Sequence, residues 1–315
     1  MAAGDMTARG PLAPGDFDPF AGVDFPDLEK SIRRPRTMID IALSGLVTVM
    51  TGLALIPLFS VVLMLFWRGG QRLSLAVFRE GPPAPLEPGG GFGNAIVGTV
   101  LMVGLAALLT VPSGILTAVF LAETKPGNRL AQVVRFAAKV LTGFPSILAG
   151  VFAYGTVVLL TGGFSAVAGA IALAVLMFPT ITLTAEDAIR MVPARMREAA
   201  IGMGATHTQT VWMVLLPTAM PGILTGVMLA VARAAGETAP LLFTALFSNY
   251  WLTAGGRVEI MQPTASLAVL IYNFAGMPFQ NQLELAWAAA LVLVLLVLVT
   301  NLIGQSLSRR QHHPI

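Results

Sequence analysis

Residues 194–217, ARMREAAIGMGATHTQTVWMVLLP, decide the fold, because they place a charged segment with small residues between two long apolar segments. Pro193 interrupts the helical pattern that precedes them. The segment from Ala194 to Met203 is predicted to form a short helix that Gly204 ends. We therefore expect a loop over residues 185–217 that lies outside the membrane.

The small residues of this loop suggest that another protein binds it. Ala199 and Ala200 are expected to give the short helix a face without bulk, which the groove of a partner can approach closely. Arg197 and Glu198 can fix the register at the rim of that contact. The alternative is an ordinary surface loop whose alanines reflect helix propensity alone.

The composition indicates a membrane protein. Hydrophobic residues make up 56% of the 315 residues and charged residues only 11%, and the mean hydropathy is +0.79. Such a chain has too little charge to cover a globular surface. It contains no cysteine, which excludes disulfides and thiolate metal sites, and its three histidines are scattered.

Six apolar segments approach or exceed the roughly 20 residues that a helix needs to cross a bilayer. The predicted fold is therefore an all-α membrane protein with six transmembrane helices over residues 33–315. Gly222 and Gly226 show the spacing that allows close helix packing. The expected spans are 39–67, 94–122, 133–160, 166–184, 218–247 and 285–303.

Residues 1–32 differ from the rest of the chain. Acidic residues alternate there with proline, glycine and single phenylalanines, without an apolar period. We expect a disordered acidic tail.

The positive-inside rule sets the expected orientation. With the N-terminus inside, thirteen lysines and arginines fall on the cytoplasmic side and four outside. Both termini and the loop around Glu198 are thus expected in the cytoplasm. The four outer residues are Arg68, Arg72, Arg79 and Arg257.

Arg233 and Glu237 form the second constellation, within the apolar segment 218–247. Charged residues in such a segment are costly and normally face the bundle interior or a wet pathway. Their i,i+4 spacing places them on one helical face. Either they form a salt bridge that joins helices, or Arg233 binds a transported oxyanion while Glu237 positions it.

The spacing E-A-A-x3-G-x9-(I/V)-x-L-P, with Val214 at the aliphatic position, resembles the "EAA" loop of permease subunits of ABC importers. Further stretches are similar to the PstA-type permeases of bacterial phosphate importers. These stretches are FPSI at 144–147, FSAVAGA at 164–170, LPTAMPGILTG at 216–226 and ARAAGETAPLLFTA at 232–245.

This resemblance implies a subunit of the bacterial inner membrane whose last five helices form a type I importer core. It implies a homologous permease (PstC), two copies of an ATPase (PstB), a phosphate-binding protein (PstS) and inorganic phosphate as partners; nucleic acid is not expected. ATP and magnesium belong to the ATPase, and no G-x-x-x-x-G-K-[ST] loop occurs in this chain. We expect no enzymatic activity and no cofactor here.

The resemblance also implies roles for individual residues. The coupling set is Arg197, Glu198, Ala199, Ala200, Gly204, Leu216 and Pro217. The expected pathway set is Arg233, Glu237, Thr238, Thr182, Thr184 and Ser146. Leu183 stands where relatives carry a basic residue, which removes a second cation from the expected pathway.

Three alternatives remain open. A permease for sulfate or molybdate would share the same features. A secondary transporter would show two similar halves with broken helices, and would leave the EAA loop unexplained. A membrane-embedded enzyme would need convergent catalytic groups, which are almost absent from the spans.

Overall fold

The computed structural model describes residues 35–125, 127–254 and 257–310, which divide into two units at Ser60. The predicted acidic tail, residues 1–32, lies outside the described residues. Most of the first helix, α1 (Pro35–Met64), belongs to the first unit. Together with the π-helical turn η1 (Leu65–Gly69), it forms an apolar segment of mean hydropathy 2.4, in agreement with the expected span 39–67.

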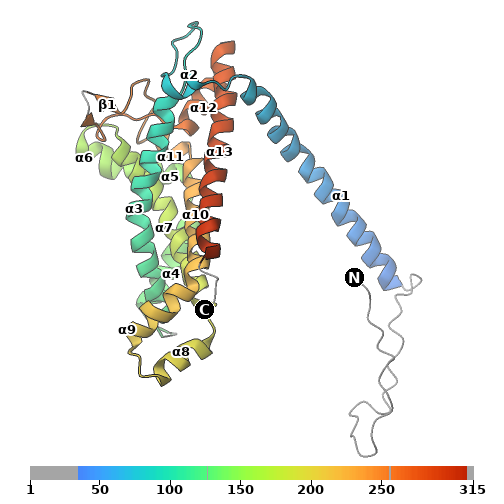
Figure 1. Cartoon of the computed structure of the whole chain (residues 1–315), viewed down its shortest axis with the longest axis vertical. Helices are drawn as coiled ribbons and strands as arrows, with labels where there is room; N and C mark the ends of the chain where they lie inside the picture. Colours follow the sequence, from blue (N-terminus) through green and yellow to red (C-terminus); the bar gives the residue numbers. More distant parts are fainter. Residues whose placement is uncertain (1–34, 126, 255–256, 311–315) are drawn as a thin grey trace, which may run out of the picture. The chain divides into compact units, whose positions relative to one another are not determined.

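The second unit, from Val61 onward, is a bundle of long helices with short helices at both ends (Figure 1). Its long helices are α3 (Gly93–Glu123), α7 (Ala166–Arg190), α10 (Leu216–Ala235) and α13 (Gln280–Arg310). The shorter helical elements are α2 (Leu75–Arg79), α4 (Arg129–Thr142), α5 (Ser146–Ala153), η2 (Tyr154–Val158), α6 (Leu159–Thr161), α8 (Ala194–Gly202), α9 (His207–Gln209), η3 (Thr210–Leu215), α11 (Ala239–Leu242) and α12 (Leu267–Ala275).

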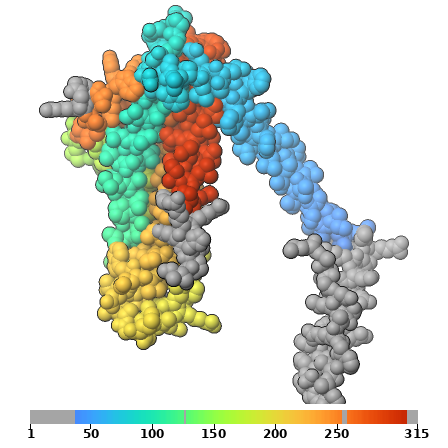
Figure 2. Space-filling model, in the orientation of Figure 1, coloured from blue at the N-terminus to red at the C-terminus, as the bar shows by residue number. Residues whose placement is uncertain are grey.

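The two ends of this bundle differ. A two-residue hairpin, β1 (Thr253–Ala254) with β2 (Arg257–Val258), lies with α2 at one end. The short helices α8 and α9 lie at the opposite end, which we call the α8 end (Figure 1). In the space-filling view the segment around α8 forms the outermost surface of that end (Figure 2).

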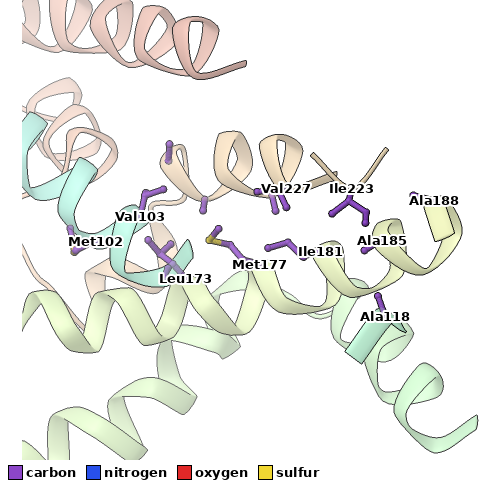
Figure 3. Packing of buried hydrophobic residues seen from close by; sticks show 14 of the residues in the cluster. Met102, Val103, Ala118, Leu173, Met177, Ile181, Ala185, Ala188, Ile223 and Val227 are labelled. Atoms are coloured by element: carbon purple, nitrogen blue, oxygen red, sulfur yellow. The ribbon is translucent and has the colours of Figure 1, made fainter. Parts of the chain in front are cut away.

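The core forms around α7, which packs against α3 and α10. Leu173 and Ile181 of α7 and Ile223 of α10 are almost completely buried (Figure 3). Met102 and Val103 contribute the side chains of α3 to the same cluster. Because α7 is enclosed on several sides, its position depends on the helices around it.

Small residues allow α7 and α10 to approach closely, as the spacing of Gly222 and Gly226 predicts. A Cβ added at Gly222 would lie 2.8 Å from the Cβ of Ala188. One added at Gly226 would overlap the side chain of Thr184. Close contact of this kind supplies the packing energy that holds helices together in lipid.

Two expected spans differ in the structure. The third, 133–160, is broken: between α4 and the segment Ser146–Thr161 the helix axis bends by 108°. Phe144 precedes Pro145, and a residue before proline is disfavoured in helical conformation. The side chains of Arg135 and Lys139 also make α4 amphipathic, so averaged hydropathy concealed the break.

The fifth span also has different bounds. The helical segment runs without a break from His207 to Ala235, so it begins before the expected start at 218 and ends before the expected end at 247. The short helix α11 follows after a turn. In total, five described helices are long and apolar enough to cross a membrane, or six if the bent pair is counted as one span.

Replacing Gly226 by Val should destabilise the bundle, because the added side chain has no room beside Thr184. Overpacking of this kind typically costs about 1–3 kcal/mol. Gly104 of α3 is the matched control, since a Cβ there meets no atom within 4 Å. Thermal unfolding of the purified chain in detergent should show a lower melting temperature for Gly226→Val than for Gly104→Val; equal melting temperatures would contradict this packing.

Candidate coupling and translocation site

The helix α8 ends as the sequence predicts, at a glycine in the left-handed region. Gly204 has φ +88°. Its N–H donates to the carbonyl of Ile201, and the N–H of Ala205 donates to the carbonyl of Ala200, at 2.9 and 3.0 Å. These two bonds form a Schellman motif, which satisfies the last carbonyls of the helix and turns the chain away.

The surface of α8 is only partly the one expected. Glu198 and Ala199 are exposed, whereas Ala200 retains only 2% of its accessible surface. Ala200 faces the chain itself, because α8 packs against η3. The exposed apolar side chains Ile201 and Met203 lie on the same helix and its cap. The expectation of an open two-alanine face is therefore wrong for Ala200 in this chain, and the outer surface combines Ala199 with larger apolar residues.

Arg197 points to Glu123, the last residue of α3. Both guanidinium nitrogens Nη1 and Nη2 donate to the carboxylate, each over 2.6 Å. The Glu123 side chain is 9% exposed, and Nε2 of His207 lies 3.4 Å from its Oε2. One carboxylate thus connects α3 with α8 and with the start of α9.

A second buried carboxylate belongs to α7. Glu186, whose side chain is 5% exposed, accepts hydrogen bonds from Arg135 of α4, the shortest over 2.6 Å. Arg190, one turn further along α7, places Nε 2.9 Å from the same oxygen. Both arginines also donate to the carbonyl of Leu121 in α3. The cluster therefore joins three helices at the α8 end.

Leu216 and Pro217 mark the junction from η3 to α10. Leu216 is buried and Pro217 is exposed. A proline inside a helix has no N–H and crowds the carbonyl four residues earlier. The π-helical turn η3 directly before it absorbs this mismatch, so the helix continues through Pro217 instead of starting there.

Arg233 and Glu237 form an ion pair, with Nε and Oε1 3.5 Å apart. Arg233 lies in the last turn of α10 and half of its side chain is exposed, while 14% of the Glu237 side chain is exposed. The structure thus places the cation at a helix end, where the helix dipole favours it, and not in the middle of a continuous span. Thr238 follows as the first residue of the next turn, before α11.

The remaining predicted pathway residues contact other parts of the chain than Arg233 and Glu237 do. Thr182 is fully buried and faces Gly114 of α3, and Thr184 faces Gly226 of α10. Ser146 begins α5 and is partly buried. The two threonines therefore occupy packed helix interfaces of this chain, and their role in transport stays a prediction.

Sequence reasoning missed the two buried carboxylates and assigned Arg135 only to a charge count. Glu123 and Arg197 are 74 positions apart, so no local pattern connects them. The available signal was a carboxylate at the last turn of an apolar helix. The helix dipole disfavours a negative charge there, which indicates a cation from elsewhere in the chain.

Comparison with known proteins gives the family. A family model described as "binding-protein-dependent transport system inner membrane component" matches residues 111–313. The chain belongs to this family. The match covers the membrane core with α7, α8 and α10, so this permease has the loop and the helices described above in the part that defines the family.

Curated relatives of this permease are similar over most of their length. A protein of Yersinia pestis named "Phosphate transport system permease protein PstA" is 39% identical over 284 residues, which cover 89% of this chain and 92% of the relative. A protein of the same name from Haemophilus influenzae is 41% identical, with 77% and 88% covered. The relative from Methanocaldococcus jannaschii, named as a probable PstA, is 32% identical, with 87% and 94% covered.

Solved structures of ABC transporters share the fold. A chain of an alginate ABC transporter superposes with a TM-score of 0.62 at 15% identity, covering 90% of this permease and all of that chain. A chain of the MetNI methionine transporter in an inward-facing conformation gives 0.58 at 22% identity, with 70% and 95% covered. The expected type I importer core is confirmed as a fold.

Replacing Glu186 by Gln should strongly destabilise this permease, because two arginines would lose their buried counter-charge. Removing one member of a buried ion pair typically costs about 3–5 kcal/mol. The control is Glu198→Gln, since Glu198 is exposed and forms no ion pair within the described part of the chain. Melting curves of both variants check this; a Glu186→Gln variant as stable as Glu198→Gln would show that the cluster contributes little.

Proposed function

We propose that this permease is a subunit of an ATP-driven importer of inorganic phosphate. The observation that carries the proposal is the combination of an importer-type core with an exposed α8, in a chain whose relatives at 39 and 41% identity bear the name of a phosphate permease. The chain forms half of a translocation pathway and transports without chemistry of its own. ATP and magnesium bind the partner ATPase.

In this proposal the α8 end faces the cytoplasm, and both termini lie there. The outer surface of α8, with Glu198 and Ala199, enters a groove of the ATPase PstB. Two copies of that ATPase, the homologous permease PstC and the phosphate-binding protein PstS complete the assembly. ATP-driven approach of the two ATPases moves α8 and changes the side of the membrane to which the pathway opens.

Arg233 provides the positive charge of the pathway. Half of its side chain is accessible, and within the described part of the chain its ion pair is with Glu237 over 3.5 Å, which leaves other guanidinium donors available to an oxyanion. The neighbouring carboxylate weakens the attraction, so phosphate can bind and leave. This balance suits a site that transports instead of storing its ligand.

Uptake of radiolabelled phosphate in a strain that lacks the endogenous permease tests the proposal. The full chain, produced with its neighbouring transport subunits, should restore uptake, and unlabelled sulfate or molybdate in excess should not compete. Copurification should recover an ATPase and a phosphate-binding protein. Competition by sulfate or molybdate, or no uptake in a fully assembled complex, would overturn phosphate as the substrate.

Ala199→Trp tests the partner-facing surface of α8. The bulky side chain projects from an exposed position, so the melting temperature of the chain should stay unchanged while ATPase copurification and uptake fall strongly. Ala200→Trp should instead destabilise the chain itself, because Ala200 is buried. Gly204→Val should disturb the end of α8 through its positive φ. Normal copurification and uptake in Ala199→Trp would contradict the proposed contact.

Arg233→Gln should insert normally but lose most phosphate transport, since the full charge that offsets desolvation of the anion is removed. The double variant Arg233→Gln/Glu237→Gln separates two roles. If the pair only joins parts of the chain, removing both charges should restore uptake. If Arg233 binds phosphate, uptake should stay low. Rates at equal membrane expression decide between the two.

A further inference from the structure

An ion pair, Arg197 with Glu123, joins α8 to the long helix α3. The helix α8 also packs on η3, where Ala200 is buried. Through η3, α8 is connected to α10. Through Arg197, it is connected to α3.

The geometry of this pair suits the transfer of a displacement. Two parallel N–H···O bonds of 2.6 Å hold the guanidinium and carboxylate planes in one orientation. A single ammonium–carboxylate contact would act as a pivot, whereas a bidentate contact resists rotation as well as separation. The low exposure of Glu123 strengthens the contact on the carboxylate side, while 36% of the Arg197 side chain stays exposed.

The position of Glu123 at the end of α3 makes a contact with a cation necessary. A carboxylate at the C-terminal end of a helix faces the negative end of the helix dipole. Glu123 therefore needs a cation, which Arg197 supplies, while His207 contacts the same carboxylate from the other side of the turn that contains Gly204. Because α3 packs extensively on α7, a displacement of Glu123 reaches the centre of the core.

We propose that Arg197 is a positioning residue that ties α8 to α3 through Glu123, so that movement of α8 by the ATPase displaces α3 together with α10. This inference rests on the proposed function. It replaces a role of Arg197 at the rim of the ATPase contact, since its guanidinium is turned into the chain. Residues on the outer surface of α8, and not Arg197, bind the ATPase.

The test measures coupling, in the complete complex reconstituted in proteoliposomes with its phosphate-binding protein. The quantity is the number of phosphate ions imported per ATP hydrolysed. Arg197→Lys keeps the charge and loses the bidentate contact, and Glu123→Gln keeps the shape and loses the charge. Both should keep the ATPase bound and lower this ratio about tenfold, as expected for loss of a charge-assisted contact.

The exchange variant Arg197→Glu/Glu123→Arg restores an ion pair of opposite polarity. It should recover a substantial part of the ratio that the single variant Arg197→Glu loses. A residue that binds the ATPase directly would not be rescued by a change in α3. Glu284→Gln is the matched control: it removes a carboxylate 4.0 Å from Arg72, far along the chain in α13, and should leave the ratio unchanged.

The outcomes separate this inference from the proposed function. If the unchanged complex imports no phosphate, the function is wrong. If it imports phosphate and Arg197→Lys and Glu123→Gln retain its ratio, the inference is wrong. Loss of ATPase copurification in Arg197→Lys, or no rescue in a folded exchange variant, would also overturn it. Melting temperatures identify variants that fail to fold. If the other variants fail to fold, the ratio measured for Arg197→Lys, the mildest change, decides whether the inference holds.

Discussion

Two nearly buried carboxylates at the α8 end determine how the long helices α3 and α7 contact α8 and α4. Glu123 ends α3 and Glu186 lies in the last turns of α7, and both side chains are largely shielded from solvent. A charge in such surroundings must be paired and hydrogen-bonded, or it is lost. Arginines from α4, α7 and α8 meet this requirement. The same contacts hold α4 against α7 and α8 against α3. Pairing of the two carboxylates therefore sets the positions of α4 and α8 at that end.

This arrangement divides the surface of α8 into two parts. Its inward part, with Arg197 and Ala200, is occupied by contacts within the chain, while Glu198 and Ala199 remain accessible. A helix held on one side by both packing and a bidentate ion pair would, under the inference above, move together with α3 and α10. Force applied to its outer side is then passed on instead of being absorbed by local rotation.

Local signals predicted much of this fold, and long-range contacts were beyond them. Hydropathy predicted the long helices, and Gly204 predicted the end of α8. Both predictions succeeded because each depends on residues within or next to the helix concerned. The break at Pro145 was concealed because the polar side chains of α4 were averaged with an apolar continuation. Arg197 was assigned to the outside, since its partner is 74 positions away. Ala200 was expected to be exposed, since the sequence does not show that α8 packs against η3. The predicted pathway residues Thr182 and Thr184 face different helices, which also depends on tertiary packing that the sequence does not show.

The continuous segment from His207 to Ala235 connects the two parts of the candidate site. Its 29 residues correspond to about 43 Å at the rise of an α-helix, with His207 beside Glu123 at one end and Arg233 in the last turn at the other. Beyond Arg233 the chain turns at Gly236 and enters α11, which approaches α5 so closely that a Cβ on Gly150 would lie 2.7 Å from the Cα of Pro240. Glu237 therefore lies between a helix that begins at the α8 end and a turn that packs on α5. If Arg233 binds the anion as proposed, a shift of the long helix along its axis would change the distance between Arg233 and Glu237, and with it the net positive potential that the pair presents to an anion.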